Sequence, residues 1–224
     1  MLKLLHQTPR WNPNLTPIHT PVALTEAQTR TQQKLVAAAM RLAESGALPT
    51  LTEVAASAGF SRATAYRYFP TQSALVAAMV EESLRPIIEW HPQHPHASER
   101  ISELLRFAYP RMLEHEGVLR AALQLSLQQW SEKRRDPHAQ ETLVRGNRKK
   151  ILKRVVEPLE GRLSPQVIQR TMHAFSLIYG SEVFMVMKDI WQVGDGEIQD
   201  LTQWMAKAIL RQAEEDARLG SEQD

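Results

Sequence analysis

The sequence contains no cysteine among its 224 residues, which excludes disulfides, zinc–thiolate sites and thiol catalysis. It also lacks any run of about 18 consecutive apolar residues, the length that a transmembrane helix requires. The first 13 residues contain one Lys and only a brief Leu4–Leu5 apolar pair, too little for the apolar region of a secretory signal. These absences predict a cytoplasmic protein with no membrane association.

The chain has little net charge, because 27 Lys and Arg residues face 25 Asp and Glu residues, which leaves +2. Hydrophobic residues make up 43% and charged residues 23%, a balance typical of a globular protein with an adequate core. The charge is unevenly distributed. Residues 1–80 hold seven Lys and Arg against three Glu, a net charge of +4, and the remainder has a net charge of −2. The basic part is the one to examine for nucleic-acid binding.

Most of the chain has the apolar spacing of helices. Residues 1–24 are the exception, because a proline at every fourth position from Pro9 to Pro21 predicts a flexible, extended arm. From Thr25 onward apolar residues recur at helical spacing, and no long stretch alternates with period two. The sequence therefore predicts an all-α protein of about nine helices. They are expected at about residues 25–45, 50–58, 62–69, 72–89, 97–114, 117–132, 139–160, 165–192 and 196–218.

Residues 50–69 have the spacing of a helix-turn-helix. Thr50 and Glu53 form the pattern of a capping box at the start of a short helix, and Gly59 supplies the turn. Ser61 then caps a second short helix, which Pro70 ends. The exposed face of this second helix is expected to present hydroxyl and guanidinium donors suited to phosphates and base edges.

The run from Gly59 to Phe69, the lead-in from Thr50 to Ala55, and Leu75 resemble the DNA-binding domain of the TetR family of bacterial transcriptional regulators. The resemblance covers residues 28–84, about a quarter of the chain. The family usually has a Lys at the start of the next helix, where its ammonium contacts a phosphate, and this chain has Gln72. The expected DNA-binding residues are Thr50, Thr52, Ser61, Arg62, Thr64, Tyr66, Arg67, Tyr68 and Thr71.

Roles can be assigned to four of these residues as hypotheses. Arg62 and Thr64 are expected to read bases, and Tyr66 and Thr71 to contact phosphates. The resemblance further implies a repressor that binds a palindromic operator in double-stranded DNA as a homodimer. A small, mainly apolar effector of unknown identity would release it. The resemblance implies no cofactor, and the sequence offers no catalytic constellation and no preorganised metal site.

The expected organisation has four parts. Residues 1–24 form the proline-rich arm, and residues 25–71 form the helix-turn-helix DNA-binding domain. Residues 72–89 form a linking helix, whose Leu75, Met79 and Leu84 should pack on both halves of the molecule. Residues 90–224 form a helical domain for ligand binding and dimerisation.

Within the last part, the resemblance places an effector cavity among the linking helix and the helices that follow it. Candidate lining residues are Trp90, Phe107, Tyr109, Met112, Trp130, His173, Phe175, Tyr179 and Glu182. Glu182 has two interpretations, as a ligand contact or as a group that reaches water or a partner residue at the subunit edge. The helices at 165–192 and 196–218 are expected to dimerise as a four-helix bundle. Candidate interface residues are Gly180, Phe184, Met187, Leu201, Trp204, Met205 and Ile209.

Other interpretations have less support. Gly59–Ala63 is one residue from a Gly-x-Ser-x-Gly nucleophile elbow, but that motif needs a preceding strand and a capped helix precedes it here. His91, His94 and His96 lie in a proline-rich link without a helical register that would preorganise metal ligands. The basic run from Arg145 to Arg154 is expected to be a solvated helix face. A helical protein–protein adaptor that does not bind DNA is the alternative function, and salt-dependent DNA binding would distinguish the two.

Overall fold

The structure, a computed structural model, describes residues 24–136 and 147–221. Within these residues the chain is helical and contains no strand beyond one isolated bridge between Glu160 and Leu163. The fold is therefore all-α, as the sequence predicts. The elements are α1 (Glu26–Glu44), α2 (Leu51–Ala58), α3 (Arg62–Tyr68), α4 (Gln72–Ile88), α5 (Ala97–Glu114), α6 (Glu116–Arg135), α7 (Asn147–Val156), the 3₁₀ turn η1 (Glu157–Leu159), α8 (Pro165–Ile178), α9 (Glu182–Phe184), the π-helix η2 (Met185–Ile190) and α10 (Asp195–Ser221).

The N-terminal helices begin at the capping residues that the sequence predicts. Thr25 and Thr50 each form a complete capping box, with Gln28 and Glu53 respectively. In each box two otherwise unpaired backbone N–H groups are satisfied by side chains. Ser61 accepts a hydrogen bond from the N–H of Thr64 at the start of α3. These local interactions determine the register of the DNA-binding motif before any tertiary packing is considered.

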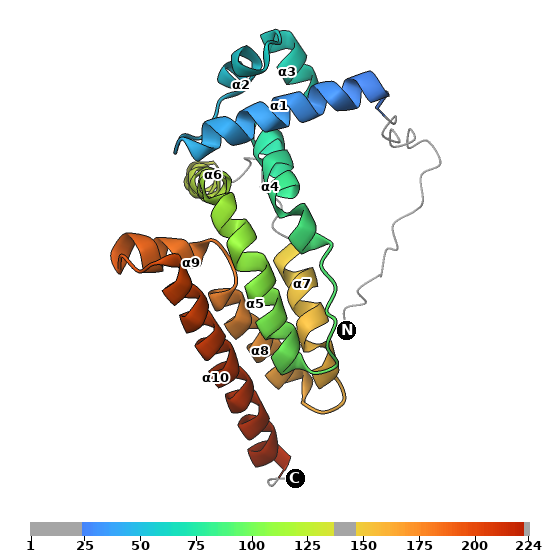
Figure 1. Cartoon of the computed structure of the whole chain (residues 1–224), viewed down its shortest axis with the longest axis vertical. Helices are drawn as coiled ribbons and strands as arrows, with labels where there is room; N and C mark the ends of the chain where they lie inside the picture. The colour runs from blue at the N-terminus through green and yellow to red at the C-terminus, as the bar shows by residue number, and fades with distance from the viewer. Residues whose placement is uncertain (1–23, 137–146, 222–224) are drawn as a thin grey trace, which may run out of the picture.

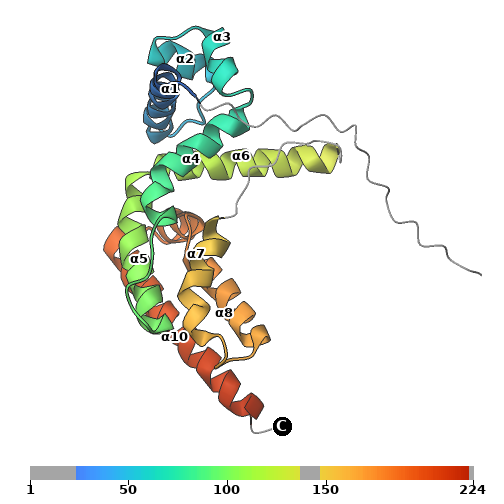
Figure 2. The same cartoon turned by 90° about the vertical axis from the view of Figure 1, so that its right-hand side faces the viewer.

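The described residues form two hydrophobic clusters connected by α4. The first joins α1, α2 and α3 to the N-terminal part of α4 and to the first half of α6. The second joins the C-terminal part of α4 to α5, α7, α8 and α10. Leu75 and Met79 of α4 are fully buried in the first cluster, and Leu84 packs against the second. The predicted double packing of this helix is confirmed, and Figures 1 and 2 show α4 running from the α1–α3 end into the body of the molecule.

The sequence predicts one helix over residues 165–192, and this prediction is wrong. Helix α8 ends at Ile178, and a turn through Gly180 separates it from α9 and the π-helix η2. Two backbone carbonyl groups at the C-terminal end of α8 accept hydrogen bonds from outside the helix. The Tyr109 hydroxyl donates to the Ile178 carbonyl at 2.7 Å, and Arg148 donates to the Ser176 carbonyl at 3.3 Å. Tertiary hydrogen bonds thus replace the helical ones at this break.

The sequence also predicts one helix over residues 139–160, and the structure shows a different ending for it. Residues 139–146 lie outside the described residues, and α7 passes into the 3₁₀ turn η1 at Glu157. Pro158 lies in that turn, where its missing N–H interrupts the α-helical bonding pattern. No helix in the described part of the chain is long and apolar enough to cross a membrane.

Candidate DNA-binding surface and regulatory cavity

Helices α2 and α3 meet at a tight turn whose geometry requires Gly59. This residue has φ of 74° and ψ of 29°, the left-handed conformation that other residues rarely adopt. Its N–H closes the last turn of α2, and the N–H of Phe60 donates to the Ala55 carbonyl at 2.9 Å. Ala55 and Ala65 are almost completely buried, and their small side chains allow α2 and α3 to pack closely.

The structure places most of the nine predicted DNA-binding residues on the surface of the motif. Thr50, Thr52, Ser61, Arg62, Tyr66 and Arg67 are exposed, and Thr64, Tyr68 and Thr71 are half-buried. The guanidinium of Arg67 lies 5.4 Å from the centre of the Tyr68 ring. Arg62 makes no contact with another charged or polar group among the described residues. Its donors are therefore available to a ligand.

Several hydroxyl groups on this surface already have intramolecular roles. Thr50, Ser61 and Thr71 cap α2, α3 and α4 by accepting hydrogen bonds from backbone N–H groups. The Thr50 hydroxyl also donates to Glu53 at 2.7 Å, and the hydrogen bonds from Thr50 hold the pKa of Glu53 below its ordinary value. These caps fix three helix N-termini, whose remaining N–H groups are suited to phosphate.

Gln72, the residue at the position of the family's usual Lys, has a structural partner. Its side-chain amide donates to the backbone carbonyl of Pro49 at 3.0 Å. This bond ties the start of α4 to the loop between α1 and α2. The sequence alone gives no sign of this contact, because 23 residues separate the two partners.

A cavity of about 480 Å³ lies beside α4 and is bordered by α6, α7 and the α8–α9 turn. Helices α4 and α6 form a largely apolar wall, and the opposite wall is polar. The lining residues are Ala77, Val80, Glu81, Leu84, Leu119, Ala122, Leu123, Asn147, Arg148, Lys149, Ser176, Ser181 and Glu182. Of the residues that the sequence suggests for an effector cavity, only Glu182 belongs to this lining.

The other eight candidates lie elsewhere. Trp90, Tyr109, Met112, Phe175 and Tyr179 are buried in the second hydrophobic cluster, and Phe107 packs against its edge. Trp130 is 62% exposed, and His173 lies on the surface of α8. Burial raises the pKa values of the Tyr109 and Tyr179 hydroxyls far above the ordinary value. The helical spacing of these apolar candidates indicates that they face inward. It does not indicate whether they line a cavity or pack in a core.

The polar wall of the cavity is organised around an ion pair. Arg148 donates to the Glu182 carboxylate at 2.6 Å, between α7 and the first residue of α9. The buried Gly180 makes room for this pair, since a β-carbon there would lie 2.2 Å from Arg148 and 2.4 Å from Glu182. Gly180 is thus enclosed by side chains of its own chain. The side chain that pairs with Glu182 is therefore Arg148 of the same chain.

The remaining candidate interface residues are also mostly covered. Phe184 is fully buried, and its ring packs edge-on against Tyr109 with centroids 5.9 Å apart. Met187, Met205 and Ile209 pack against the second cluster, and Leu201 is half-buried. Trp204 is 66% exposed. Other large exposed apolar side chains, which are not among the named interface candidates, lie on α8, η2 and the turn after η2. They are Leu177, Met185, Val186, Ile190 and Trp191.

Among the described residues, His, Asp and Glu side chains do not gather in groups of three that could hold a metal ion. The candidate binding features described so far are therefore the donor-bearing face of α3 and the walls of the cavity. The class of protein that the fold and the α2–α3 motif define is an all-α protein with an N-terminal helix-turn-helix.

Comparison with known proteins specifies that class further. Residues 35–79 match the family model of bacterial regulatory proteins of the tetR family. The fold is similar to a tetR-family transcriptional regulator from Streptomyces coelicolor, with a TM-score of 0.62 and 18% identity over 83% of this chain and 82% of the other. It is also similar to a TetR transcriptional regulator from Rhodococcus sp. RHA1, with a TM-score of 0.56 and 19% identity over 83% and 97%. No curated protein matches the chain. Residues 35–79 thus resemble the DNA-binding helix-turn-helix part of tetR-family regulatory proteins, and the chain as a whole shares the fold of these two regulators.

Proposed function

We propose that the protein is a homodimeric repressor that binds a palindromic operator and leaves it when a small molecule enters the cavity beside α4. The observation that carries the DNA-binding part is the exposed face of α3. Arg62, Tyr66 and Arg67 project from a short helix that packs on α1 and α2 through Ala65 and its neighbours. A helix held in this way can enter the major groove as a rigid unit.

Arg62 is the residue that we assign to base recognition. It lies in the first turn of α3, and the N-terminal residues of a recognition helix are those that contact base edges. Because Arg62 has no partner among the described residues, binding DNA does not require it to give up an intramolecular contact. Thr64 is the second candidate, although its N–H and hydroxyl are both hydrogen-bonded to Ser61. Tyr66 and Thr71 are assigned to phosphates.

The test begins by selecting an operator from a random duplex library with the full-length protein. Arg62→Ala should then weaken operator binding by about 1–3 kcal/mol, roughly 5- to 150-fold, and relax the preference at one base pair. Its melting temperature should not change, because no native contact is lost. Arg162→Ala is the matched control, an exposed Arg in the turn between η1 and α8. Unchanged operator affinity in Arg62→Ala would contradict the assignment. A wild-type protein that recovers no sequence would favour the adaptor alternative.

The proposed dimer uses the exposed apolar side chains of α8, η2 and α10. Leu177 is 80% exposed, and Ile190, Trp191 and Trp204 are each at least 66% exposed. Helices α8 and α10, which carry Leu177 and Trp204, pack against each other, and contiguous exposed apolar residues are typical of interaction surfaces. A two-fold dimer presents two copies of α3, so its operator should contain two inverted half-sites about one helical turn apart or a multiple of that distance.

The proposed effector site is the cavity beside α4. Its volume of about 480 Å³ lies in the range of small-molecule sites. The apolar wall of Val80, Leu84 and Leu119 suits a mainly apolar ligand, and Arg148 with Glu182 can bind a polar group at one end. Because α4 carries both the cavity wall and the N-terminal cluster, a ligand that prefers one position of α4 would change the DNA-binding state.

Filling the cavity tests this proposal without knowledge of the effector. Leu123→Trp places a large ring in the cavity, and Leu127→Trp, four residues further along α6 on an exposed position, is the control. We expect both variants to bind the operator, and a panel of small apolar compounds to release the wild type and Leu127→Trp but not Leu123→Trp. A compound that releases all three equally would place the effector site elsewhere.

A further inference from the structure

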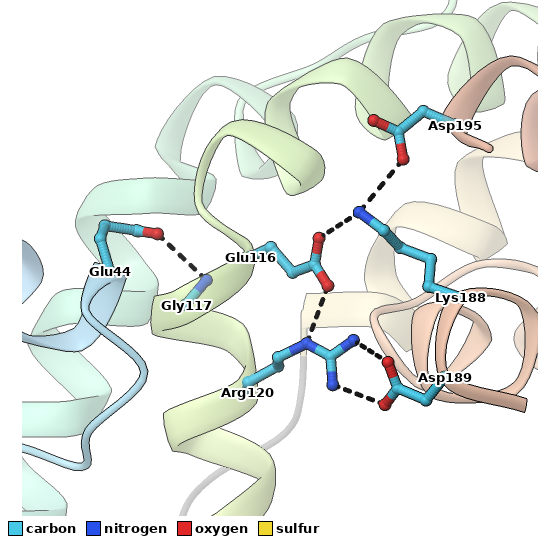
Figure 3. A network of polar contacts seen from close by, with 7 residues as sticks. All are labelled: Glu44, Glu116, Gly117, Arg120, Lys188, Asp189 and Asp195. Carbon is cyan, nitrogen blue, oxygen red and sulfur yellow. Dashed lines mark hydrogen bonds and ion pairs between the residues drawn. The ribbon is translucent and has the colours of Figure 1, made fainter. Parts of the chain in front are cut away.

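The first turn of α6 is held between the DNA-binding end of the molecule and the η2–α10 segment. On one side Glu116 and Arg120 face Lys188 and Asp189 of η2 and Asp195 at the start of α10. On the other side Gly117 faces Glu44 at the end of α1. Figure 3 shows the connected contacts among Glu116, Arg120, Lys188, Asp189 and Asp195, and beside them the separate hydrogen bond from the Gly117 N–H to Glu44. The contacts of α6 with η2 and with α1 join residues that are 69 to 73 positions apart in sequence.

The contacts toward η2 and α10 form a connected ionic group, which we call the α6 clasp: Glu116, Arg120, Lys188, Asp189 and Asp195. Arg120 donates two hydrogen bonds to Asp189, both at 2.7 Å, in the planar bidentate arrangement that favours Arg over Lys. Its Nε donates to Glu116 at 2.8 Å. Lys188 donates to the same Glu116 carboxylate at 2.6 Å and lies 3.1 Å from Asp195.

The charges of the clasp reinforce one another. The hydrogen bonds from Arg120 hold the pKa of Asp189 below its ordinary value, and the bond to Glu116 raises the pKa of Lys188. The clasp contains two cations and three carboxylates, so each cation bridges two anions. An isolated surface ion pair contributes little to stability, whereas a bridged group with a bidentate Arg restricts the relative position of its helices.

The contact toward α1 is a direct approach of two backbones. The N–H of Gly117 donates to the Glu44 carboxylate at 3.1 Å. A β-carbon on Gly117 would lie 2.6 Å from the Ala43 carbonyl oxygen and 2.7 Å from the Glu44 Cα. Backbone atoms cannot move aside as a flexible side chain can, so only glycine allows this approach. One and four residues further along α6, Val118 and Ala121 belong to the same buried cluster as α1.

We propose that the α6 clasp, through Gly117, determines where the DNA-binding domain sits relative to the η2–α10 segment. The clasp residues are thus positioning residues for operator binding and touch no DNA themselves. This inference rests on the proposed dimer, because η2 also carries the exposed Ile190. The same six-residue π-helix thus carries Ile190, which we assign to the proposed subunit contact, and the clasp residues Lys188 and Asp189. The clasp thereby sets the separation of the two recognition helices.

The first experiment measures that separation directly. The chain has no cysteine, so Ser57→Cys, an exposed position on α2, accepts a single spin label per subunit. The distance between the two labels of a dimer is recorded by pulsed electron spin resonance. Asp189→Asn and Gly117→Ala should each shift or broaden the distance distribution. Glu157→Gln is the control, since it removes an ion pair to Arg100 that also joins distant segments but lies away from the DNA-binding end.

The second experiment uses the selected operator and versions whose half-sites are one base pair closer or further apart. Asp189→Asn should lose about fivefold or more in affinity for the selected spacing and should discriminate less among spacings. Sedimentation of Asp189→Asn should show an intact dimer. A variant that had lost its subunit contacts would sediment as a monomer instead. Asp189→Glu, which keeps the charge, should retain most of the spacing preference.

The outcomes separate this inference from the proposed function. If the labelled parent gives no inter-subunit distance, the dimer and with it the inference fail. If the parent dimer binds a palindrome and both Asp189→Asn and Gly117→Ala keep its distances and spacing preference, the clasp does not position the domain and only the inference fails. Distances and spacing that change in the two variants but not in Glu157→Gln support it.

Discussion

The turn between α2 and α3 gives a stability prediction whose size follows from the geometry of one residue. Gly59 has φ of 74°, and a β-carbon built there would meet nothing within 4 Å. A substitution therefore meets no steric conflict with neighbours, and its cost is confined to the backbone. For an L-residue that cost is about 1–2 kcal/mol. We expect Gly59→Ala to lower the free energy of unfolding by this amount, which corresponds to roughly 2–8 °C in melting temperature.

Two further substitutions at Gly59 make the reasoning sharper. Asn adopts the left-handed conformation more readily than other residues, so Gly59→Asn should cost less than Gly59→Ala. A β-branched residue adopts it least, so Gly59→Val should cost more. Urea unfolding of the three variants measures the order directly. If Val proves as stable as Asn, or if Ala stabilises the protein, the left-handed backbone is not what this position requires.

Three other predictions follow from single contacts. Tyr109→Phe removes the buried hydroxyl that donates to the Ile178 carbonyl, and leaving that carbonyl unpaired should cost about 1–3 kcal/mol in thermal unfolding. Trp204→Glu replaces an exposed apolar side chain of α10 with a charge, and sedimentation should show monomers that bind the operator weakly. Because the folded pKa of Glu53 is lowered from 4.5, its stabilising contribution is complete above that pH and is lost as pH falls through the folded pKa. Glu53→Gln should therefore flatten the acid limb of the stability–pH curve, and an unchanged slope below pH 4.5 would contradict this.

The sequence predicts the DNA-binding motif closely because the signals there are local. Thr50, Glu53 and Ser61 form their caps with residues three positions away, so their geometry is determined within one helical turn. Gly59 ends α2 for an equally local reason, its left-handed backbone. Pattern reasoning works where the interacting partners are neighbours in sequence.

The cavity and the break after α8 could not be predicted in this way, because both depend on distant partners. The helical pattern continues through residues 165–192, but Tyr109 and Arg148 hold the carbonyls at the end of α8. Periodicity identifies Phe175 and Tyr179 as inward-facing without specifying whether core or cavity lies beside them. The sequence predicts a solvated face for the basic run, yet Arg154 donates to the carbonyls of Ile88, the last residue of α4, and of Trp90 just beyond it.

The sharing of α6 between the two hydrophobic clusters has a consequence for how the protein can be divided. Val118, Ala121, Ala122 and Leu125 come from α6, yet they pack in the cluster that supports the recognition helix. A fragment that ends after α4 would leave the underside of α1 and α4 open to water at these positions. The smallest piece able to fold and read DNA therefore extends through α6, well beyond the motif that identifies it. Exchanging only the first four helices with those of another regulator would transplant a recognition helix without part of the core that holds it in place.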